Sequence, residues 1–466
     1  MYFEELLELE NDENIWNFSL NDKVLLWPQI RYSIFWEMQK KRYNLSNPHI
    51  KETLNIKDII RYIISIILKN PFRIKKNQIL ILNFSINYIL LYNKYYKDRI
   101  YDEYIFGEKG FQKLERVTKL KIREPKLIKA IYIDLIYAII KVIKTFIIIN
   151  HVQKTKIYNF VKYLSSKEII RKNDKRYYIL MIENIYRANI LKNIIFKLYL
   201  SFVKPRCIII QCAHYGGDAI LINIAKKKRI PTIEMQHGYI GEGHLAYNYN
   251  EKFMHKAENI LPDYIFTYGE YWNSKIRSPS KKIAIGNAFL EKVMNENIEE
   301  KKESEMQRRL ILISSGTMPE KILEISEKIY QLFNGQYELV FRPHPSEMPD
   351  IDRRYNELKE YFSIDTGNIY NTIKNAEILI SLEMSTLLFE SVGIVKTIVL
   401  INNKATNEYI YDKKLPFYII ESIKEISLIK ELNNINIERE ELWKSNAREN
   451  FIVSIDKILR EYQKSK

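Results

Sequence analysis

The sequence predicts an α/β protein with two doubly wound domains that face each other across a cleft. Short apolar runs of strand length alternate with helical segments from residue 206 onwards. The charged segment Glu291 to Arg309, which has no apolar stripe, divides this alternation into two series. Such alternation predicts parallel sheets with helices on both faces. A chain of 466 residues is also too long for one ordinary core.

The strands of the first series are predicted from apolar runs that end in polar or glycine-containing turns. A helix is expected from Ala219 to Lys228, after the turn Tyr215-Gly216-Gly217-Asp218. The predicted strands are Gln78 to Phe84, Cys207 to Gln211, Pro231 to Met235, Tyr264 to Tyr268 and Lys282 to Ile285.

The second series repeats the pattern. Its predicted strands are Leu310 to Ile313, Tyr337 to Phe341, Glu377 to Ile380 and Lys396 to Ile401. We therefore expect a helical N-terminal region at 1–76 and a first Rossmann-like domain at 77–290 that carries a helical insertion at about 112–204. A linker at 291–309, a second Rossmann-like domain at 310–415 and C-terminal helices at 416–466 complete the prediction.

The net charge of +16 is unevenly distributed. Residues 1–205 hold 37 basic and 20 acidic residues, whereas residues 206–466 hold 36 and 37. A genome rich in lysine codons would raise both halves alike, so the difference favours a basic surface on the first half. Basic, apolar helical segments at 57–69 and 127–149 suggest contact with an anionic membrane surface. Ordinary packing of helices on the domain is the alternative.

The chain shows no secretory or membrane-spanning signal. Its N-terminus, Met1-Tyr2-Phe3-Glu4-Glu5, is acidic where a signal peptide is basic. Charges interrupt the most apolar stretch, Leu127 to Ile149. Two cysteines, Cys207 and Cys212, give no disulfide framework and match no common metal-site spacing. We expect a cytoplasmic protein, peripherally associated with the inner face of the cytoplasmic membrane, with no nucleic-acid partner.

Two polar clusters of the second series suggest a phosphate site. Ser315, Gly316 and Thr317 follow the first strand, where small residues let the backbone approach a ligand. Arg342 and the sequence Pro343-His344-Pro345 follow the second strand. The two prolines fix φ and present His344 rigidly. Because ligands bind at the carboxyl ends of parallel strands, we expect Ser315, Gly316, Thr317, Arg342, His344 and Pro345 to bind the phosphate of a nucleotide donor.

A third cluster follows the next strand of this series. Ser385 and Thr386 stand where a helix begins, so hydroxyl and backbone N–H groups face the same place. Glu390 lies four residues after Thr386, on the same helix face, where it is placed to accept hydrogen bonds from ribose hydroxyls. Glu383 precedes the helix and is the alternative carboxylate, as a cap.

The first series has its densest polar loop at residues 236–244. His237 stands directly after a predicted strand, where an imidazole is the usual base for removing a proton from a hydroxyl group. Asp218 is the rival base. His214, Gln236 and His244 are expected on the acceptor side of the same site.

Together these motifs resemble those of GT-B glycosyltransferases of bacterial capsule and lipopolysaccharide assembly, especially the sialyltransferase- and Kdo-transferase-like groups. The resemblance covers roughly residues 206–402, with a weaker echo at 78–110. It rests on Gln236-His237-Gly238, Pro262-Asp263-Tyr264, Tyr268-Gly269, Ile285-Gly286-Asn287, Arg342-Pro343-His344-Pro345 and the pattern Ser381 to Thr386.

The resemblance implies a nucleotide-sugar donor, with CMP-sugars favoured, bound by the second domain, and a glycan or lipid-linked glycan acceptor bound by the first. It implies neither a metal nor a cofactor. His344-Pro345 and Ser385-Thr386 match positions that touch the nucleotide phosphate in sialyltransferase-like enzymes. Two departures matter: Glu383 and Glu390 are seven apart where a common GT-B pattern has eight, and the acidic base motif of sialyltransferases has no match.

Two alternatives to a glycosyltransferase remain. Glycerol- or ribitol-phosphate transferases of wall teichoic acid synthesis share a His-Gly loop and a similar fold, so a CDP-glycerol- or CDP-ribitol-dependent transferase is the runner-up. A membrane-associated scaffold that kept the fold and lost activity is the non-catalytic alternative. The presence of His237, His344 and Ser385 favours an enzyme.

Overall fold

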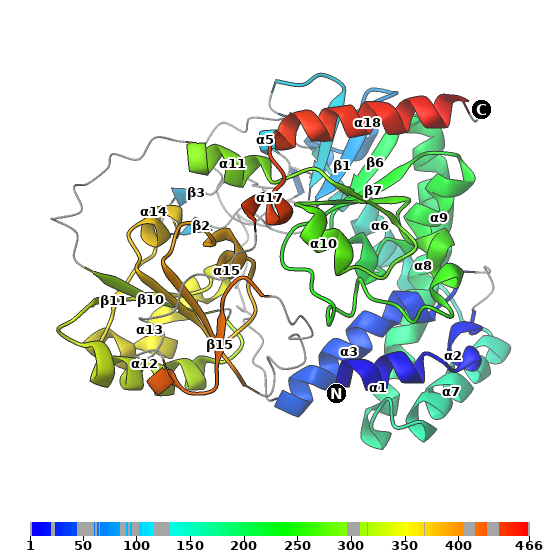
Figure 1. Ribbon diagram of the computed structural model, residues 1–466. Helices are drawn as coiled ribbons and strands as arrows, with labels where there is room; N and C mark the ends of the chain where they lie inside the picture. Colours follow the sequence, from blue (N-terminus) through cyan, green and yellow to red (C-terminus); the bar gives the residue numbers. More distant parts are fainter. Residues whose placement is uncertain are drawn as a thin grey trace.

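The computed structural model describes most of the chain (Figure 1). The described residues are 2–19, 24–43, 60, 63–64, 66–83, 90–91, 94–95, 102–105, 107–115, 131–295, 308–314, 316–367, 369–403, 415–425 and 438–464.

The first domain is built on a seven-stranded parallel sheet with the order β5-β4-β1-β6-β7-β8-β9. Its central strands are apolar and buried on both faces, as parallel strands between helical layers require. The strands are β1 (Ile79–Asn83), β4 (Phe111–Glu115), β5 (Ile131–Tyr132), β6 (Cys207–Ile210), β7 (Thr232–Met235), β8 (Tyr264–Thr267) and β9 (Lys281–Ala284). A separate antiparallel pair consists of β2 (Leu90–Leu91) and β3 (Lys94–Tyr95).

The second domain has a six-stranded parallel sheet with the order β12-β11-β10-β13-β14-β15. Its strands are β10 (Arg309–Ile313), β11 (Glu338–Arg342), β12 (Ser363–Ile364), β13 (Ile378–Ser381), β14 (Thr397–Ile401) and β15 (Tyr418–Ile420). In each sheet the chain order reverses beside the first strand, which is the doubly wound topology. The predicted fold class, two doubly wound α/β domains, is confirmed.

Helices cover both sheets. In the first domain they are α5 (Asp102–Ile105), α6 (Asp134–Ile143), α7 (His151–Ser166), α8 (Lys175–Val203), α9 (Ala219–Lys227), α10 (Glu270–Ser274) and α11 (Ala288–Asn295), with short 3₁₀ turns η1 (Pro71–Arg73), η2 (Lys144–Phe146), η3 (Lys172–Asp174), η4 (Ala213–Tyr215) and η5 (Met254–Ile260). In the second they are α12 (Pro319–Phe333), α13 (Ile351–Tyr355), α14 (Ile369–Lys374) and α15 (Thr386–Glu390), with η7 (Pro345–Asp350), η8 (Glu357–Glu360) and η10 (Ile423–Glu425).

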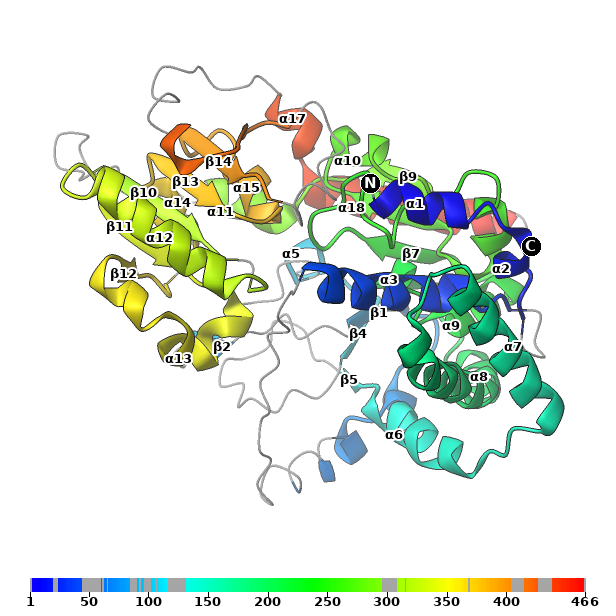
Figure 2. The same ribbon diagram turned by 90° about the horizontal axis from the view of Figure 1, so that it is seen from below.

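The two ends of the chain both pack on the first domain. The N-terminal helices α1 (Tyr2–Leu9), α2 (Glu13–Trp16) and α3 (Trp27–Tyr43) share a core with α7 and α8, and Figure 2 shows α3 beside these helices. After α17 (Arg439–Leu442), helix α18 (Ala447–Lys464) lies across the first sheet, where Phe451 and Ile455 are buried against it (Figure 1).

The predicted helical insertion at about 112–204 is wrong at its beginning, because β4 and β5 belong to the sheet. Strand β4 reads as polar because it contains Lys113 and Glu115. These two side chains form a buried ion pair with an N–O distance of 3.0 Å, so the strand tolerates charges inside the domain. Among the described residues of this region, the first helix begins at Asp134.

Two other boundaries also differ from the prediction. Residues 291–295 of the predicted linker belong to α11, because Leu290 and Val293, three residues apart, are buried in a core shared with the second sheet. Residues 296–307 lie outside the described part. Among the predicted C-terminal helices, Tyr418–Ile420 instead forms β15, a strand too short to show a period in the sequence.

A hydrophobic cluster joins the two domains. Trp272 after β8 and Trp443 after α17 pack against Phe389 of α15, and the Trp443 indole N–H donates to the Phe389 carbonyl at 3.3 Å. Arg439 of α17 donates to the Val392 carbonyl at 3.1 Å. The contact therefore joins the helices after β8 and before α18 to the helix after β13.

Within the described residues, no single helix combines the length and apolarity needed to cross a membrane. The segments Asp134–Phe146 and His151–Ser166 meet the criterion only together, and they are bent by 103° at the break between them. The predicted helix at 57–69 lies largely outside the described residues, although residues 60, 63–64 and 66–68 are helical.

Candidate functional site

The loop after β7 lies against the beginning of α15 in the other domain. A Cβ atom placed on Gly238 would lie 3.4 Å from the Thr386 hydroxyl oxygen. The ring of Tyr239 stacks on Phe389 with a centroid separation of 5.5 Å. Two of the predicted clusters, one from each domain, are therefore adjacent, and the strand ends of both sheets converge on this contact.

Gln236 fixes the loop that carries His237. Its side chain is buried, its amide nitrogen donates to the Gly238 carbonyl at 2.9 Å, and its amide oxygen accepts from the Tyr268 backbone N–H at 2.9 Å. Both polar ends of the side chain are therefore used to hold the loops after β7 and β8 together. Gln236 thus positions the loop, and the predicted contact with an acceptor stays a prediction.

His237 is half-buried beside Cys212, whose sulfur lies 3.4 Å from the Nε2 atom. Burial lowers the pKa of His237 below its usual value, an effect that Glu234 partly opposes. Burial raises the pKa of the Cys212 thiol, with Glu234 and Asp218 adding to the effect. At neutral pH the pair is therefore an uncharged imidazole beside a protonated thiol. A neutral imidazole is the form that accepts a proton.

A buried network lies beneath this loop. Glu234 in β7 accepts from the His214 ring Nδ1 and backbone N–H and from the Tyr247 hydroxyl at 2.7 Å. The other ring nitrogen of His214 lies 2.8 Å from the Ser278 hydroxyl and 3.3 Å from that of Ser280. His214 is 1% exposed, so in this conformation it positions the loops; its predicted acceptor contact stays a prediction.

His244 belongs to the aromatic side of the same network. Its Nε2 atom lies 3.3 Å from the Tyr215 hydroxyl, its Nδ1 atom accepts from the Ala246 backbone N–H at 3.3 Å, and its ring stacks over Tyr32. Burial, with His237 and His214 nearby, lowers the pKa of His244 to about 3. This side chain is neutral in the folded protein, and contact with an acceptor stays a prediction.

Asp218, the rival base, precedes α9 and is buried. The Tyr137 hydroxyl of α6 donates to its carboxylate at 3.4 Å. Its charge also raises the pKa of Cys212, which places the carboxylate in the electrostatic surroundings of the His237 pair. Both candidate bases therefore lie at the carboxyl ends of the strands of the first sheet.

The N-terminal helices pack against the loops that follow β6 and β7. A Cβ atom on Gly216, which has φ of +85°, would lie 2.7 Å from the Gln29 backbone of α3. Arg31 forms a fully buried ion pair with Glu10, at 2.6 Å, and also donates to the carbonyls of Leu245 and Asn248. The helices at 1–43 are therefore part of the support of the site.

In the second domain, His344 is exposed at the end of β11. Its backbone N–H donates to Glu347 at 2.8 Å, and the fully buried Glu347 also accepts from the Tyr355 hydroxyl. Surrounding protein atoms lower the pKa of His344, and Glu347 opposes this effect. The loop is anchored through its backbone, and the His344 side chain is exposed at the end of β11.

Arg342 is directed towards the sheet edge. Its guanidinium donates to the Gly367 carbonyl at 2.8 Å and to Asp365 at 3.3 Å, and the residue is 6% exposed. These bonds hold the segment after β12 beside β11. In this conformation Arg342 is a structural clamp, and its predicted role in donor binding stays a prediction.

The turn after β10 contacts the turn after β13. The Thr317 hydroxyl donates to the Glu383 carboxylate, and the Gly316 backbone N–H donates to the Ser314 hydroxyl at 3.0 Å. Gly316 has φ of +90°, a conformation that favours glycine. Ser315 lies outside the described residues, as does the side chain of Pro345. Glu383 therefore accepts a hydrogen bond from Thr317, and its role as a cap of α15 stays a prediction.

Ser385 caps α15, because its hydroxyl accepts from the Leu387 backbone N–H at 3.3 Å. Thr386 begins the helix and is half-buried, facing the other domain. Glu390 is only 5% exposed and accepts from the Tyr370 hydroxyl of α14 at 2.8 Å. It thus links α14 to α15 in this conformation, and ribose binding by Glu390 stays a prediction.

Sequence reasoning missed several residues of the site. Glu234 and Glu347 each bind a histidine of the site, and Cys212 contacts His237. A signal existed for Glu234, since a carboxylate inside an otherwise apolar strand needs buried partners. In the part of the chain that the structure describes, no three His, Cys, Asp or Glu side chains form a group that could hold a metal ion.

No family model and no curated protein matches this chain. Among solved structures, it is similar to the wall teichoic acid polymerase TagF, with 12% identity, coverage of 87% of this chain and 97% of that one, and a TM-score of 0.44. It is also similar to UDP-GlcNAc 2-epimerases. For the Neisseria meningitidis enzyme the identity is 12%, the coverage 82% and 100%, and the TM-score 0.44. For the Methanocaldococcus jannaschii enzyme these values are 16%, 58% and 81%, and 0.40.

Proposed function

We propose that this protein is a GT-B-type glycosyltransferase of the sialyltransferase- and Kdo-transferase-like groups. It transfers a sugar from a nucleotide-activated donor, with CMP-sugars favoured, to a growing bacterial surface polysaccharide or lipooligosaccharide. The observation that carries this proposal is the contact between the His237–Gly238 loop of the first domain and Thr386 of the second. A transfer reaction needs an acceptor-side base and a donor-phosphate site beside each other.

His237 is the proposed base. Its lowered pKa keeps the imidazole neutral at pH 7, so it accepts the proton of the attacking acceptor hydroxyl. That oxygen forms the new bond to the anomeric carbon as the bond from this carbon to the phosphate oxygen breaks. The nucleotide leaves with the bonding electron pair, and the negative charge develops on its phosphate.

The second domain is proposed to receive that charge. His344 is exposed beside the anchored backbone of its loop, and Ser385 and Thr386 lie after the neighbouring β13. Hydrogen-bond donors aimed at a leaving phosphate stabilise it most in a site that excludes water. Gly316 and Thr317 line the adjacent turn, where the Thr317–Glu383 bond holds the loop in place.

The acceptor is proposed to be a glycan or lipid-linked glycan at the inner face of the cytoplasmic membrane. The supporting observation is the charge distribution, +17 for residues 1–205 against −1 for the rest. A basic half attracts the anionic leaflet on which such acceptors are built.

A polyol-phosphate transferase that uses CDP-glycerol or CDP-ribitol is the second candidate. The His237-Gly238 loop favours it as much as it favours a glycosyltransferase, because both reactions need a base for a hydroxyl and a site for a cytidine nucleotide. The products differ: polyol-phosphate transfer leaves the donor's phosphorus in the acceptor, and glycosyl transfer does not.

A thermal-shift panel with CMP, CDP, UDP and GDP tests the nucleotide, because binding to the folded state stabilises by RT ln(1 + [L]/Kd). A cytidine nucleotide is expected to give the largest shift. Incubation with CMP-sialic acid, CMP-Kdo or CDP-glycerol, with phosphorus analysis of the product, then separates the two transferases. A chain that binds none of the four nucleotides and turns over no donor is the scaffold.

A further inference from the structure

Exposed apolar side chains are concentrated in one part of the molecule. Of the 20 large apolar residues that are exposed in the described chain, 17 lie between residues 60 and 202, and only two lie in the second domain. Soluble proteins rarely expose large contiguous apolar patches without a binding role. We call the central members of this set the apolar face: Ile60, Ile63, Ile64, Ile67, Leu68, Phe72, Val142, Ile143, Phe146, Ile148, Ile194, Leu198 and Phe202.

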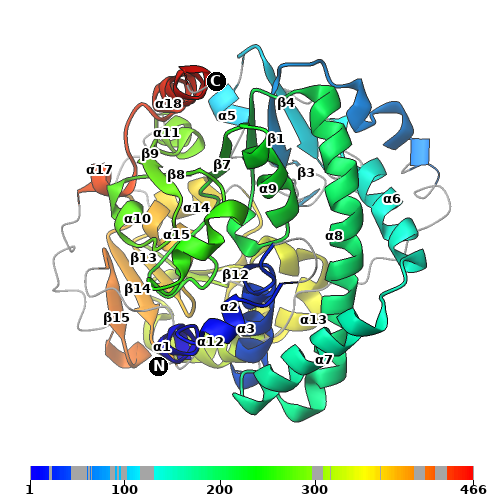
Figure 3. The ribbon, with the colours of Figure 1, turned by 90° about the vertical axis from the view of Figure 1, so that its right-hand side faces the viewer.

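These residues come from three neighbouring segments. Phe72 packs edge-on against Tyr199 and Phe202 of α8, with centroid separations of 5.8 and 6.1 Å. The Tyr132 backbone N–H, just before α6, donates to the Lys69 carbonyl at 2.7 Å. Figures 2 and 3 both show α6 on the side of the first domain where α8 runs, with the helical residues near 60–68 beside α6.

The most exposed point of the face is the bend between α6 and α7. Phe146 is 78% and Ile148 91% exposed there. Lys141 and Lys144 precede these residues in the sequence. Bulky apolar side chains at a sharp turn, with lysines beside them, are the composition of segments that enter a lipid headgroup layer.

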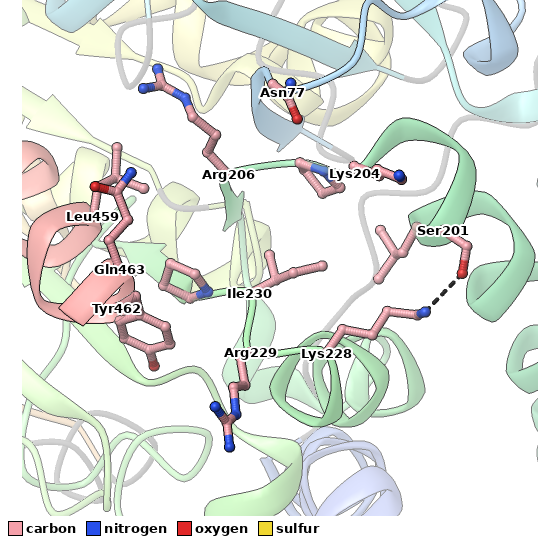
Figure 4. A pocket seen from close by; sticks show the side chains of 13 residues that line it. Asn77, Ser201, Lys204, Arg206, Lys228, Arg229, Ile230, Leu459, Tyr462 and Gln463 are labelled. Carbon is pink, nitrogen blue, oxygen red and sulfur yellow. Dashed lines mark hydrogen bonds between the residues drawn. The ribbon is translucent and has the colours of Figure 1, made fainter. Parts of the chain in front are cut away.

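A basic pocket adjoins the face at the end of α8 (Figure 4). The pocket has a volume of about 480 Å³ and lies beside the beginnings of β6 and β7, at the opposite edge of the sheet from His237. Lys204 and Arg206 come from one rim, and Lys228 and Arg229 come from the other. Its 13 lining residues include no carboxylate.

The pocket and the face are continuous along α8. Ser201 lines the pocket, and Leu198 of the face lies three residues before it, on the same side of the helix. A phosphate group in the pocket would meet several cations, and acyl chains would meet the apolar residues beside it. One ligand that carries both parts is a phospholipid.

We propose that this surface docks on an anionic bilayer, with the pocket holding a phospholipid headgroup phosphate and the apolar face entering the interfacial layer. The inference rests on the proposed membrane association and adds its location and orientation. A second copy of the chain is disfavoured as the occupant, because it would bring two basic halves together. Asp218 and His237 follow the opposite ends of the strands from the pocket, so docking through the pocket leaves them uncovered.

Flotation of the full chain with vesicles tests this orientation. The vesicles contain phosphatidylcholine alone or with phosphatidylglycerol, at low and at high salt. Two variants probe the surface: Arg206→Ala/Lys228→Ala in the pocket and Phe146→Ser/Ile148→Ser at the bend. The matched controls are Lys321→Ala on α12 and Val453→Ser on α18, which are exposed and lie elsewhere.

The wild-type chain should float with anionic vesicles, and less at high salt. Each removed charge should weaken binding roughly fivefold, so the pocket variant should lose about 25-fold, the bend variant at least tenfold, and the controls less than twofold. Thermal melting verifies that each variant is folded. Light scattering without vesicles should show the same mass for the wild type and both variants.

Three outcomes overturn the inference. If both variants float like the wild type, membrane association stands and this surface is not its site. If a variant instead dissociates a dimer, the occupant is a second copy. If the wild type floats with neither vesicle, the proposed membrane association itself fails. Transfer to a soluble acceptor, measured in parallel, reports separately on the proposed reaction.

Discussion

The two domains share a topology but hold their polar loops in different ways. In the first domain, the loops after β6 and β7 are bonded internally through Glu234 and His214 and are supported from behind by α3. In the second, Glu347 anchors the backbone of its loop and leaves the His344 imidazole exposed.

The difference fits the two roles proposed for these loops, which are catalysis by a base and binding of a phosphate. A base must be held close to one geometry, because small misplacements of a reacting group cost much of the rate. A phosphate-binding loop needs exposed donors that meet the ligand as it arrives. The loops proposed to serve the acceptor are therefore bonded internally, while the loop proposed to bind the donor phosphate keeps an exposed histidine.

The largest expected effect is on catalysis by the first domain. His237→Ala should lower kcat by about 10²- to 10⁴-fold, the usual contribution of a general base, and leave the donor Kd within twofold. Steady-state kinetics and calorimetric titration with the donor measure the two quantities. His255→Ala, an exposed histidine in η5, is the control. A rate within threefold of the wild type would transfer the role to Asp218, for which Asp218→Asn is the direct test.

The buried ion pair behind the loops of the first domain should also contribute more to the free energy of unfolding than an exposed ion pair of the second domain. Arg31→Met leaves the Glu10 carboxylate buried without its positively charged partner and should lower the free energy of unfolding by about 3–5 kcal/mol. Arg308→Met in the second domain breaks an ion pair with Glu377 whose arginine is 51% exposed, so it should cost at most about 1 kcal/mol. Urea denaturation measures both. Equal losses would contradict the contrast between the two halves.

The sequence predicted some strands of the two sheets and missed others. The strands were predictable, because buried parallel strands such as β6 and β13 read as continuous apolar runs. Strand β4 was not, since its buried Lys113–Glu115 pair has the composition of a surface segment. The pattern of apolar and polar residues does not show that Lys113 and Glu115 form an ion pair with each other.

The candidate site was likewise predicted only in part from the sequence. His237 and Thr386 were placed at strand ends by the sequence, and the structure brings their loops together. The orientation of Glu390 and Arg342 was beyond sequence reasoning, because Tyr370 and Gly367, which bind them, are distant in the chain. A polar residue near a strand end is thus predictable, while its partner depends on the packing of the next helix.

The donor side should respond to a change at His344. His344→Ala should weaken donor binding by about 1.5–3 kcal/mol, the range for a hydrogen bond to a charged group. The kcat at saturating donor should fall less than it does in His237→Ala. Calorimetric titration measures the affinity, and His237→Ala serves as the crossed control. Unchanged donor affinity in His344→Ala would remove this residue from the site.

The first domain should also give a slope in the pH dependence of stability. His244 is enclosed by Tyr32, Tyr215 and Tyr247 and lies near His237 and His214, and its pKa is lowered to about 3. Its unfolded value is about 6.5. Between these values the unfolded chain binds a proton that the folded chain does not, so stability is full above pH 6.5 and falls as the pH decreases towards 3.

One such group contributes a slope of up to about 1.4 kcal/mol per pH unit. Urea denaturation at pH 7.0, 5.5 and 4.5 should therefore show a shallower decline for His244→Asn than for the wild type, since the variant lacks this proton uptake. Carboxylates titrate in both proteins and cancel in the difference. Parallel declines would mean that His244 is hydrated in the folded state, and the tightly enclosed loop network of the first domain would then be looser than its contacts indicate.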